Sequence, residues 1–191
     1  MKVGLFFGSF NPVHIGHLIL ANHILEYSDI DELWFVITPR SPFKKNESLA
    51  DDYQRLHMVN LAIDEYEHMR TSKVEFDMPQ PNYTVHTLAK LREDYPQHSF
   101  TLIMGEDNLT HLHKWKNAAY LVENYDILVY PRLHKSKKKP KVSMDRITMV
   151  DAPIIEISST AIRQAYKDGK NTKPLLPNKV YTYLDGSNLY L

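Results

Sequence analysis

Residues 3–17, VGLFFGSFNPVHIGH, decide the fold of this chain. They read as an apolar strand, a turn that begins at Gly8, and an apolar helix that continues over about residues 17–27. A strand that breaks at glycine and continues as a helix is how α/β sheets build a phosphate site, because the helix N-terminus offers unpaired N–H groups and a positive potential. We therefore expect this turn to bind phosphate, with Gly8 allowing the backbone to approach its ligand.

Two histidines at the start of this helix are candidates for phosphate contact. His14 and His17 are three residues apart, so on a first helical turn they lie on one side. Two ring N–H donors at that place suit an anion that gains charge during a reaction. As metal ligands they would need a third protein ligand, and neither an H-E-x-x-H pattern nor a cysteine supplies one. A surface or capping role without function is the other alternative; we favour phosphate contact and expect no metal site built by the protein.

The length and composition of the chain exclude several classes of protein. Its 191 residues suffice for one well-buried domain, which we expect to span residues 1–191 with a helical portion from about residue 158. The 23 basic and 23 acidic residues balance, so bulk charge does not favour nucleic acid as a partner. No run of about 18 apolar residues and no charged leader is present, so we expect a cytoplasmic protein that does not bind membranes. The absence of cysteine excludes disulfides and thiol catalysis.

Apolar runs of strand length alternate with helical patterns along the chain. We expect strands at residues 3–7, 32–38, 73–76, 99–104, 125–130, 147–150 and 154–157. We expect helices at about residues 17–27, 51–66, 84–95, 158–167 and 178–184, with a helical region over residues 109–121 and Gly169 as a C-cap. This alternation predicts an α/β fold with a Rossmann-like, doubly wound and mainly parallel sheet that carries helices on both faces. Ligands of such sheets bind at the carboxyl ends of the strands.

A second polar cluster opens the helix expected from residue 158. The stretch 157–163, ISSTAIR, places Ser158, Ser159 and Thr160 at a helix N-terminus, where hydroxyl groups are good caps on any helix. Arg163 lies one turn further on. Hydroxyls, free N–H groups and a guanidinium could together hold a polyphosphate tail at this place.

These two stretches resemble the signatures of known enzymes. The sequence HIGH at residues 14–17, after a Gly-Ser-Phe-Asn-Pro turn, resembles the first signature of the nucleotidyltransferase superfamily, and its spacing matches neither a dinucleotide fold nor a P-loop. Class I aminoacyl-tRNA synthetases share HIGH, but they are much longer and carry a Lys-Met-Ser-Lys-Ser loop that residues 136–140 do not match. The stretch ISSTAIR resembles the second signature of the nicotinate and nicotinamide mononucleotide adenylyltransferases.

Two further segments resemble the bacterial nicotinate-specific branch of that family. Residues 41–44, SPFK, are similar to its Pro-Pro-His-Lys/Arg loop. The resemblance implies that Lys44 holds the mononucleotide phosphate, with a solvated lysine as the alternative. Residues 82–88, NYTVHTL, are similar to the family's Ser-Tyr-Thr-x-x-Thr-Leu segment, which lines the pyridine pocket.

Residues 105–115 resemble the family's Gly-x-Asp pattern followed by a leucine and a tryptophan. The resemblance implies that Asp107 holds a ribose hydroxyl of ATP and that Trp115 stacks on the pyridine ring. Core packing is the alternative for Trp115, which lies at helical spacing from Leu112. Arg132, which follows the strand expected at 125–130, is a further candidate for the substrate phosphate.

The resemblance implies two substrate sites. The ATP site consists of Gly8, Ser9, Phe10, His14, His17, Gly105, Asp107, Ile157, Ser158, Ser159, Thr160 and Arg163, of which His14, His17 and Arg163 are catalytic. The nicotinate mononucleotide site consists of Asn11, Lys44, Tyr83, Thr84, Trp115 and Arg132. The chain departs from the family pattern at Phe7, Asn11 and Phe43, where glycine, aspartate and histidine are common.

The implied reaction is attack by the 5′-phosphate of nicotinate mononucleotide on the α-phosphorus of ATP, which gives nicotinate adenine dinucleotide and pyrophosphate in NAD biosynthesis. No protein base is needed, because a phosphate monoester has a second pKa of about 6 and is already an anion near neutral pH. We expect Mg²⁺ as the cofactor, carried mainly by the phosphates of ATP.

Several alternatives remain open from the sequence. Nicotinamide mononucleotide or phosphopantetheine could be the acceptor. Nicotinate and nicotinamide differ by the one charge of the ring carboxylate, and the sequence pattern does not show which of the two the site prefers. A non-catalytic nucleotide-binding protein, with its basic residues 132–141 against an acidic partner, is the more distant alternative. Homo-oligomerisation and the role of residues 185–191 also stay open.

Overall fold

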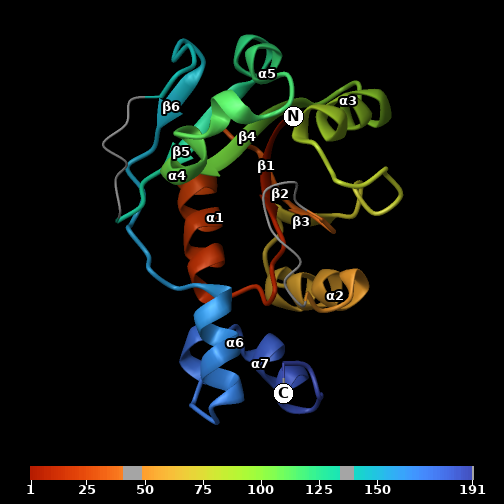
Figure 1. Ribbon diagram of the computed structural model, residues 1–191, viewed down its shortest axis with the longest axis vertical. Coiled ribbons are helices and arrows are strands. Elements are labelled where there is room, and N and C mark those ends of the chain that lie inside the picture. Colours follow the sequence, from red (N-terminus) through yellow and green to blue (C-terminus); the bar gives the residue numbers. More distant parts are fainter. Residues whose placement is uncertain (41–48, 134–139, 191) are drawn as a thin grey trace.

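The structure, a computed structural model, describes residues 1–40, 49–133 and 140–190. In this part of the chain six strands form one sheet in the order β3-β2-β1-β4-β5-β6, with every neighbouring pair parallel (Figure 1). The strands are β1 Lys2–Gly8, β2 Glu32–Ile37, β3 Met69–Ser72, β4 Ser99–Gly105, β5 Asp126–Tyr130 and β6 Ile147–Met149. The strand order reverses at β1, which lies between β2 and β4. Open sheets bind their ligands at such a point.

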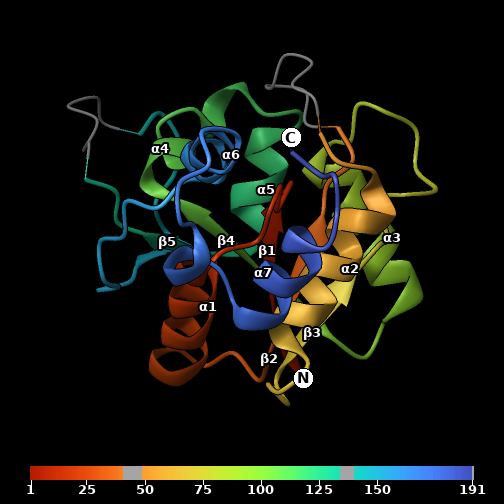
Figure 2. The same cartoon turned by 90° about the horizontal axis from the view of Figure 1, so that it is seen from below.

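Helices cover both faces of the sheet, as the sequence predicts. One face carries α1 Ile15–Tyr27 and α2 Asp52–Ile63, and the other carries α3 Thr84–Asp94 and α5 Ala118–Asn124. The helices α6 Ser159–Lys167 and α7 Asn178–Asp185 lie beyond the carboxyl ends of the strands (Figure 1). Short helical segments are α4 Glu106–Leu109 and the 3-10 helices η1 Leu112–Lys114 and η2 Lys173–Leu175. Figure 2 shows α7 against α2. No helix in the described residues is long and apolar enough to cross a membrane.

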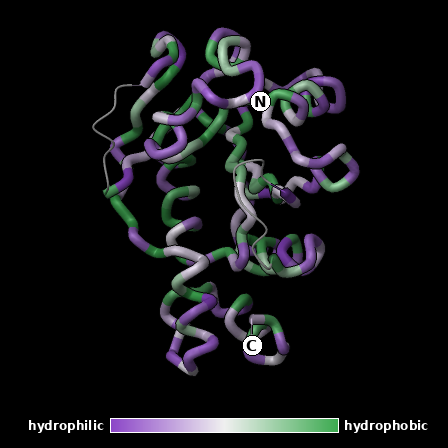
Figure 3. The backbone as a smooth tube through the Cα atoms, in the orientation of Figure 1, coloured by the Kyte–Doolittle hydropathy of each residue, from purple (hydrophilic) through white to green (hydrophobic). Residues whose placement is uncertain are grey.

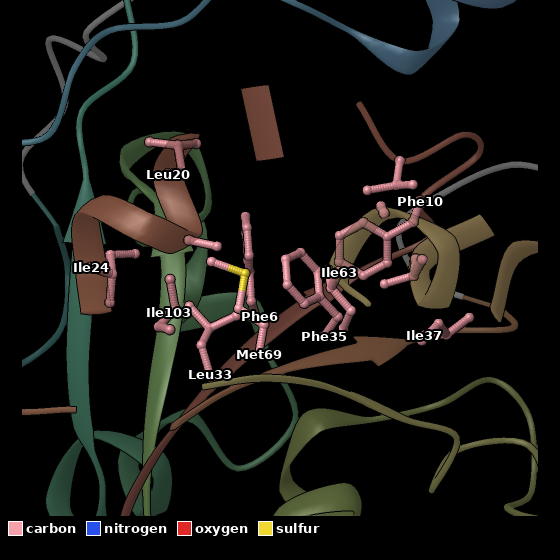
Figure 4. Close-up of a cluster of buried hydrophobic side chains, with 14 of the residues drawn as sticks. Phe6, Phe10, Leu20, Ile24, Leu33, Phe35, Ile37, Ile63, Met69 and Ile103 are labelled. Carbon is pink, nitrogen blue, oxygen red and sulfur yellow. The ribbon is translucent and has the colours of Figure 1, made fainter. Parts of the chain in front are cut away.

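Alternating side chains of the strands fill two hydrophobic clusters, one on each face of the sheet. In β2, Leu33, Phe35 and Ile37 enter the cluster beneath α1 and α2, which Figure 4 shows in close-up. Trp34 and Val36 enter the second cluster, beneath α3 and α5. Every residue of β2 is buried, and the central strands are largely coloured as hydrophobic in Figure 3. A strand covered on both faces reads in sequence as an almost unbroken apolar run, which is why β2 is predictable.

Two of the expected strands are wrong. Residues 73–76 form turns, with the N–H of Phe76 donating to the carbonyl of Lys73 at 3.0 Å. The strand in this region is the preceding segment β3, whose sequence MRTS is polar because β3 lies at the edge of the sheet and pairs only with β2. Residues 154–157 form no strand, and their alternating apolar side chains Ile155 and Ile157 pack on the first cluster instead.

Helix boundaries also differ from expectation in three places. The helix α2 ends at Ile63, three residues before the expected end at residue 66. The helix α1 begins at Ile15, two residues before the expected start, because His14 is its N-cap residue. The expected helical region 109–121 divides into α4, η1 and α5, with Asn117 at a φ of 52° just before α5. The C-cap prediction is confirmed, since Gly169 has a φ of +68° beyond the end of α6.

The buried guanidinium of Arg55 holds the loops at the carboxyl ends of β1 and β2. This residue of α2 is 0% exposed. Its Nη1 donates to the carbonyls of Ser9 at 2.7 Å and Thr38 at 3.0 Å. Its Nε donates to the carbonyl of Ala50 at 3.1 Å, and an ion pair with Asp52 completes the set. Because several segments bond to one cation, Arg55 fixes the turn after β1 relative to the end of β2.

We expect Arg55→Met to lower the free energy of unfolding by about 3 kcal/mol, because it leaves three backbone carbonyls without their donor. Urea denaturation followed by circular dichroism measures this loss. Arg146→Met is the matched control, since the ion pair of Arg146 with Asp126 (3.0 Å) is exposed. It should change the free energy of unfolding by about 1 kcal/mol or less. Similar small losses in both variants would contradict the role of Arg55.

Candidate active site

A cavity of about 930 Å³ opens at the carboxyl ends of the central strands. Gly8 at the end of β1, Thr38 after β2, Asp107 after β4 and Tyr130 at the end of β5 line it. This is where the sheet topology predicts a ligand, and the volume is typical of sites for small molecules.

The ring of Phe10 supports the turn that follows β1. A Cβ at position 8 would lie 2.8 Å from this ring, so only glycine fits there. Phe10 has a φ of 45° and is 2% exposed. Its ring centroid lies 5.3 Å from that of Phe35 and 5.1 Å from that of His17. Phe10, an expected ATP contact, thus lines the cavity mainly as a support for the turn and for His17.

His14 and His17 lie together at the N-terminus of α1, as predicted. Their rings stack with centroids 3.7 Å apart and planes at 22°. The backbone N–H of His14, the N-cap residue, donates to Nδ1 of His17 at 3.2 Å. A ring nitrogen that accepts a hydrogen bond carries no proton, so the neutral His17 ring carries its proton on Nε2. Both rings line the cavity, and His17 presents a donor of fixed tautomer.

The ring of His14 is held in its neutral form. The residue is 5% exposed, and burial together with the nearby charge of Arg132 lowers its pKa to about 4. A Cβ at position 16 would lie 3.1 Å from Nδ1 of His14, so Gly16 makes room for the ring. At neutral pH His14 is therefore an uncharged imidazole that can donate one hydrogen bond from its ring.

The helix α6 brings the second sequence motif to the first. The hydroxyl of Ser159 donates to the carbonyl of Pro12 at 2.9 Å, across 147 positions of sequence. Nη1 of Arg163 donates to the carbonyl of Asn11 at 2.8 Å. Ser158 caps the helix by accepting the N–H of Ala161 at 3.1 Å. As a result the cavity that His14 and His17 line is also lined by Ile157, Ser158, Ser159, Thr160 and Arg163.

An ion pair between Asp107 and Arg132 forms another part of the cavity wall. Nε of Arg132 lies 3.5 Å from Oδ1 of Asp107. A Cβ at position 105 would lie 2.4 Å from the same oxygen, so Gly105 allows the carboxylate to sit at the end of β4. The guanidinium of Arg132 also lies over the ring of Tyr130, 5.1 Å from its centroid. Arg132 and His14 line the same cavity, and the charge of Arg132 contributes to the lowered pKa of His14.

Aromatic side chains form a further part of the wall. Tyr83 and Trp115 both line the cavity, and both also pack against the second hydrophobic cluster. Trp115 thus packs on the core and also lines the cavity, and its stacking on a pyridine ring stays a prediction. Thr84, the first residue of α3, lines the cavity beside them. The ammonium of Lys116 lies 4.6 Å from the centroid of the Tyr83 ring.

Two expected mononucleotide contacts are not among the described residues that line the cavity. Lys44, like Phe43, lies outside the described residues. Asn11 is 1% exposed and is not among the described residues that line the cavity. Its Oδ1 accepts the N–H of Ala50 at 3.1 Å and the hydroxyl of Tyr190 at 2.5 Å. Asn11 thus ties the turn to the segment before α2 and to the C-terminal segment.

Known proteins resemble this chain over its whole length. The cytidylyltransferase-like family matches residues 5–165. A probable nicotinate-nucleotide adenylyltransferase of Flavobacterium psychrophilum is 54% identical over 191 residues, which are 100% of this chain and 99% of that protein. A probable nicotinate-nucleotide adenylyltransferase of Flavobacterium johnsoniae is 53% identical over 191 residues, which are 100% of this chain and 99% of that protein. The chain belongs to the nicotinate-nucleotide adenylyltransferase family.

Solved structures of nicotinic acid mononucleotide adenylyltransferase share the fold. That of Plasmodium falciparum complexed with NaAD superposes with a TM-score of 0.80 at 19% identity, over 99% of this chain and 97% of the other. The same enzyme complexed with APC gives a TM-score of 0.76 at 20% identity, over 99% and 96%. These likenesses confirm the predicted Rossmann-like parallel sheet.

Sequence reasoning missed three residues that shape the site, namely the buried Arg55 and Glu75 and the half-buried Tyr190. Glu75 lines the cavity, is 1% exposed, and accepts the hydroxyl of Thr87 at 2.6 Å. Burial raises the pKa of its carboxyl group. The carbonyl of Glu75 also accepts from Nδ2 of Asn82 at 3.1 Å, which fixes the segment before Tyr83. The hydrogen-bond partners of these residues do not follow the regular spacing of one helix or strand. The hydrophobic periodicity of the sequence therefore does not predict these contacts.

The low pKa of His14 predicts that stability falls on acidification. In an unfolded chain histidine has a pKa of about 6.5. Between that value and the folded pKa of about 4 the unfolded state binds more protons, so the free energy of unfolding falls as the pH falls. We expect His14 to account for a loss of about 2 kcal/mol between pH 7 and pH 5.

Chemical denaturation at pH 7 and pH 5 measures this effect in the natural protein and in His14→Gln. The variant lacks the titrating ring, so its free energy of unfolding should depend less on pH over this interval. An identical dependence in both proteins would show that His14 is not held neutral by the fold.

Proposed function

We propose that this chain transfers the adenylyl group of ATP to nicotinate mononucleotide, making nicotinate adenine dinucleotide and pyrophosphate for NAD biosynthesis. The observation that carries the proposal is that the N-termini of α1 and α6 meet in one cavity, joined by the bonds of Ser159 and Arg163 to the turn after β1. Membership of the nicotinate-nucleotide adenylyltransferase family supports these substrates. The Plasmodium falciparum relative complexed with NaAD supports the product.

In the proposed reaction an oxygen of the mononucleotide 5′-phosphate bonds to the α-phosphorus of ATP while the bond to pyrophosphate breaks. The nucleophile is an anion near neutral pH, because the second pKa of a phosphate monoester is about 6. The site therefore needs no general base. Its task is to align the two substrates and to stabilise the charge that develops on the phosphate oxygens.

We assign the α- and β-phosphates to the turn after β1 and to the N-terminus of α1. Gly8 and Ser9 line the cavity at this turn, and the first N–H groups of α1 supply positive potential. The Nε2–H of His17 and the ring N–H of neutral His14 add two donors held in place by their stacking. Donors that are already oriented stabilise developing charge without reorganisation.

We assign the leaving pyrophosphate to the N-terminus of α6. Arg163 supplies charge, and its Nη2 lies 3.4 Å from Oγ1 of Thr160, so the two side chains form one unit. The hydroxyl of Ser159 acts by fixing the helix, because it donates to the carbonyl of Pro12. Asp107 at the carboxyl end of β4 takes a ribose hydroxyl of ATP in this scheme.

We assign the pyridine ring to the wall formed by Tyr83, Thr84 and Trp115, since aromatic faces suit a flat ring. Lys44 and Arg132 are the proposed contacts of the mononucleotide phosphate. Asn11 acts indirectly, through its bonds to Ala50 and Tyr190, by holding the turn.

We propose that Mg²⁺ enters with the triphosphate. Among the residues that the structure describes, no three histidine, aspartate or glutamate side chains are grouped to hold a metal ion. Such a cavity fits an ion held by phosphate oxygens and water, which is how Mg²⁺ commonly binds. When bound, the ion neutralises charge on the phosphates.

We expect His17→Ala to lower kcat for pyrophosphate release from ATP and nicotinate mononucleotide by roughly two orders of magnitude, because it removes a fixed donor to the reacting phosphate. Circular dichroism checks that the variant is folded. His23→Ala is the matched control, since His23 lies on the same helix but stacks on Tyr27 at 4.5 Å, outside the cavity.

The same assay with phosphopantetheine in place of nicotinate mononucleotide should give no turnover in the natural protein. A folded His17→Ala variant with undiminished kcat would refute the assignment of His17. Turnover of phosphopantetheine alone would refute the proposed acceptor.

A further inference from the structure

The part of the cavity wall near Tyr83 carries a positive charge, the ammonium group of Lys116. The ammonium of Lys116 lies over the face of the Tyr83 ring, 4.6 Å from its centroid, and both residues line the cavity. An aromatic face attracts a cation and limits its movement. Trp115, the residue before Lys116, lines the same cavity. The ammonium group is thus placed beside the aromatic wall.

No carboxylate of the described residues neutralises this charge. Three acidic side chains line the cavity. Asp52 is paired with Arg55, and Asp107 with Arg132. The third, Glu75, accepts from the hydroxyl of Thr87, and its burial disfavours the charged form. Lys116 is exposed, so its charge is accessible to a ligand that enters the cavity.

The N-terminus of α3 adds potential of the same sign. Thr84 opens this helix of 11 residues and lines the cavity. The first hydrogen bond of the helix runs from the N–H of His86 to the carbonyl of Tyr83 at 2.9 Å, so the N–H groups of Thr84 and Val85 precede the helix ladder. Such an end of a helix is attractive to an anion. A flat ring against Tyr83 and Trp115 would thus meet two sources of positive potential, the helix end and Lys116.

We propose that Lys116 is a specificity-determining residue that selects an acceptor whose ring bears a carboxylate over one whose ring bears a carboxamide. The inference rests on the proposed function, because it takes the acceptor to be a pyridine mononucleotide. Nicotinate and nicotinamide mononucleotide have nearly the same shape and differ by one charge. Shape alone discriminates poorly between such substrates, whereas a cation without a counter-charge in the wall discriminates by electrostatics.

The test is the ratio of kcat/KM for nicotinate mononucleotide to kcat/KM for nicotinamide mononucleotide, measured by pyrophosphate release at saturating ATP and Mg²⁺. We expect Lys116→Met to lower this ratio about tenfold, through a higher KM for nicotinate mononucleotide. The KM for nicotinamide mononucleotide and the KM for ATP should stay within about twofold, because neither depends on the ammonium charge. Lys116→Arg keeps the charge and should keep most of the ratio.

Lys114→Met is the matched control, since Lys114 lines the same cavity but does not lie over the Tyr83 ring. It should leave the ratio unchanged. An unchanged ratio in Lys116→Met would overturn the proposal, and so would an equal loss for both acceptors, which would indicate a packing role. Failure of the proposed function itself looks different, because the natural protein would then release no pyrophosphate with either acceptor.

Discussion

The hydrogen bonds from α6 to two backbone carbonyls are the interactions on which the site depends. Ser159 bonds the carbonyl of Pro12 at 2.9 Å and Arg163 bonds that of Asn11 at 2.8 Å. They bring a helix from the end of the chain onto the turn after its first strand, so that two positive helix ends face one cavity. Because the acceptors are backbone atoms, this docking does not depend on which side chain occupies position 11.

The turn itself is held by residues that no ligand needs to touch. Arg55 bonds the carbonyl of Ser9 from inside the fold, and Oδ1 of Asn11 accepts from Ala50 and Tyr190. An aspartate at this position could accept the same two hydrogen bonds. The C-terminal segment, through Tyr190, therefore belongs to the framework of the site. A turn fixed from several sides can present oriented donors to phosphate, which is what charge stabilisation requires.

Sequence reasoning succeeded where the pattern is local. The strand β2 is predictable because it is buried on both faces, and His14 and His17 are predictable because helix geometry places them together. It failed at β3, where an edge position permits a polar sequence. It also failed at residues 154–157, where alternating apolar side chains pack on the core without a strand partner.

The long-range polar contacts could not be predicted in the same way. Arg55 lies in a helix with ordinary amphipathic spacing, and only the fold brings Ser9 and Thr38 to its guanidinium. The position of Lys116 over Tyr83 depends on the loop that follows η1 meeting the start of α3. Such contacts join different elements of the fold. Hydrophobic periodicity describes the pattern within one element, so it does not predict contacts between elements.

The central claim is that one cavity holds the triphosphate between the N-termini of α1 and α6 and the pyridine ring against the aromatic wall. A crystal structure with nicotinate mononucleotide and a non-hydrolysable ATP analogue tests it most directly. We expect phosphate oxygens within hydrogen-bond distance of His17 Nε2 and of Arg163, and the pyridine ring against Tyr83 and Trp115. A triphosphate bound away from α6, or a pyridine ring beside Asp107, would contradict it.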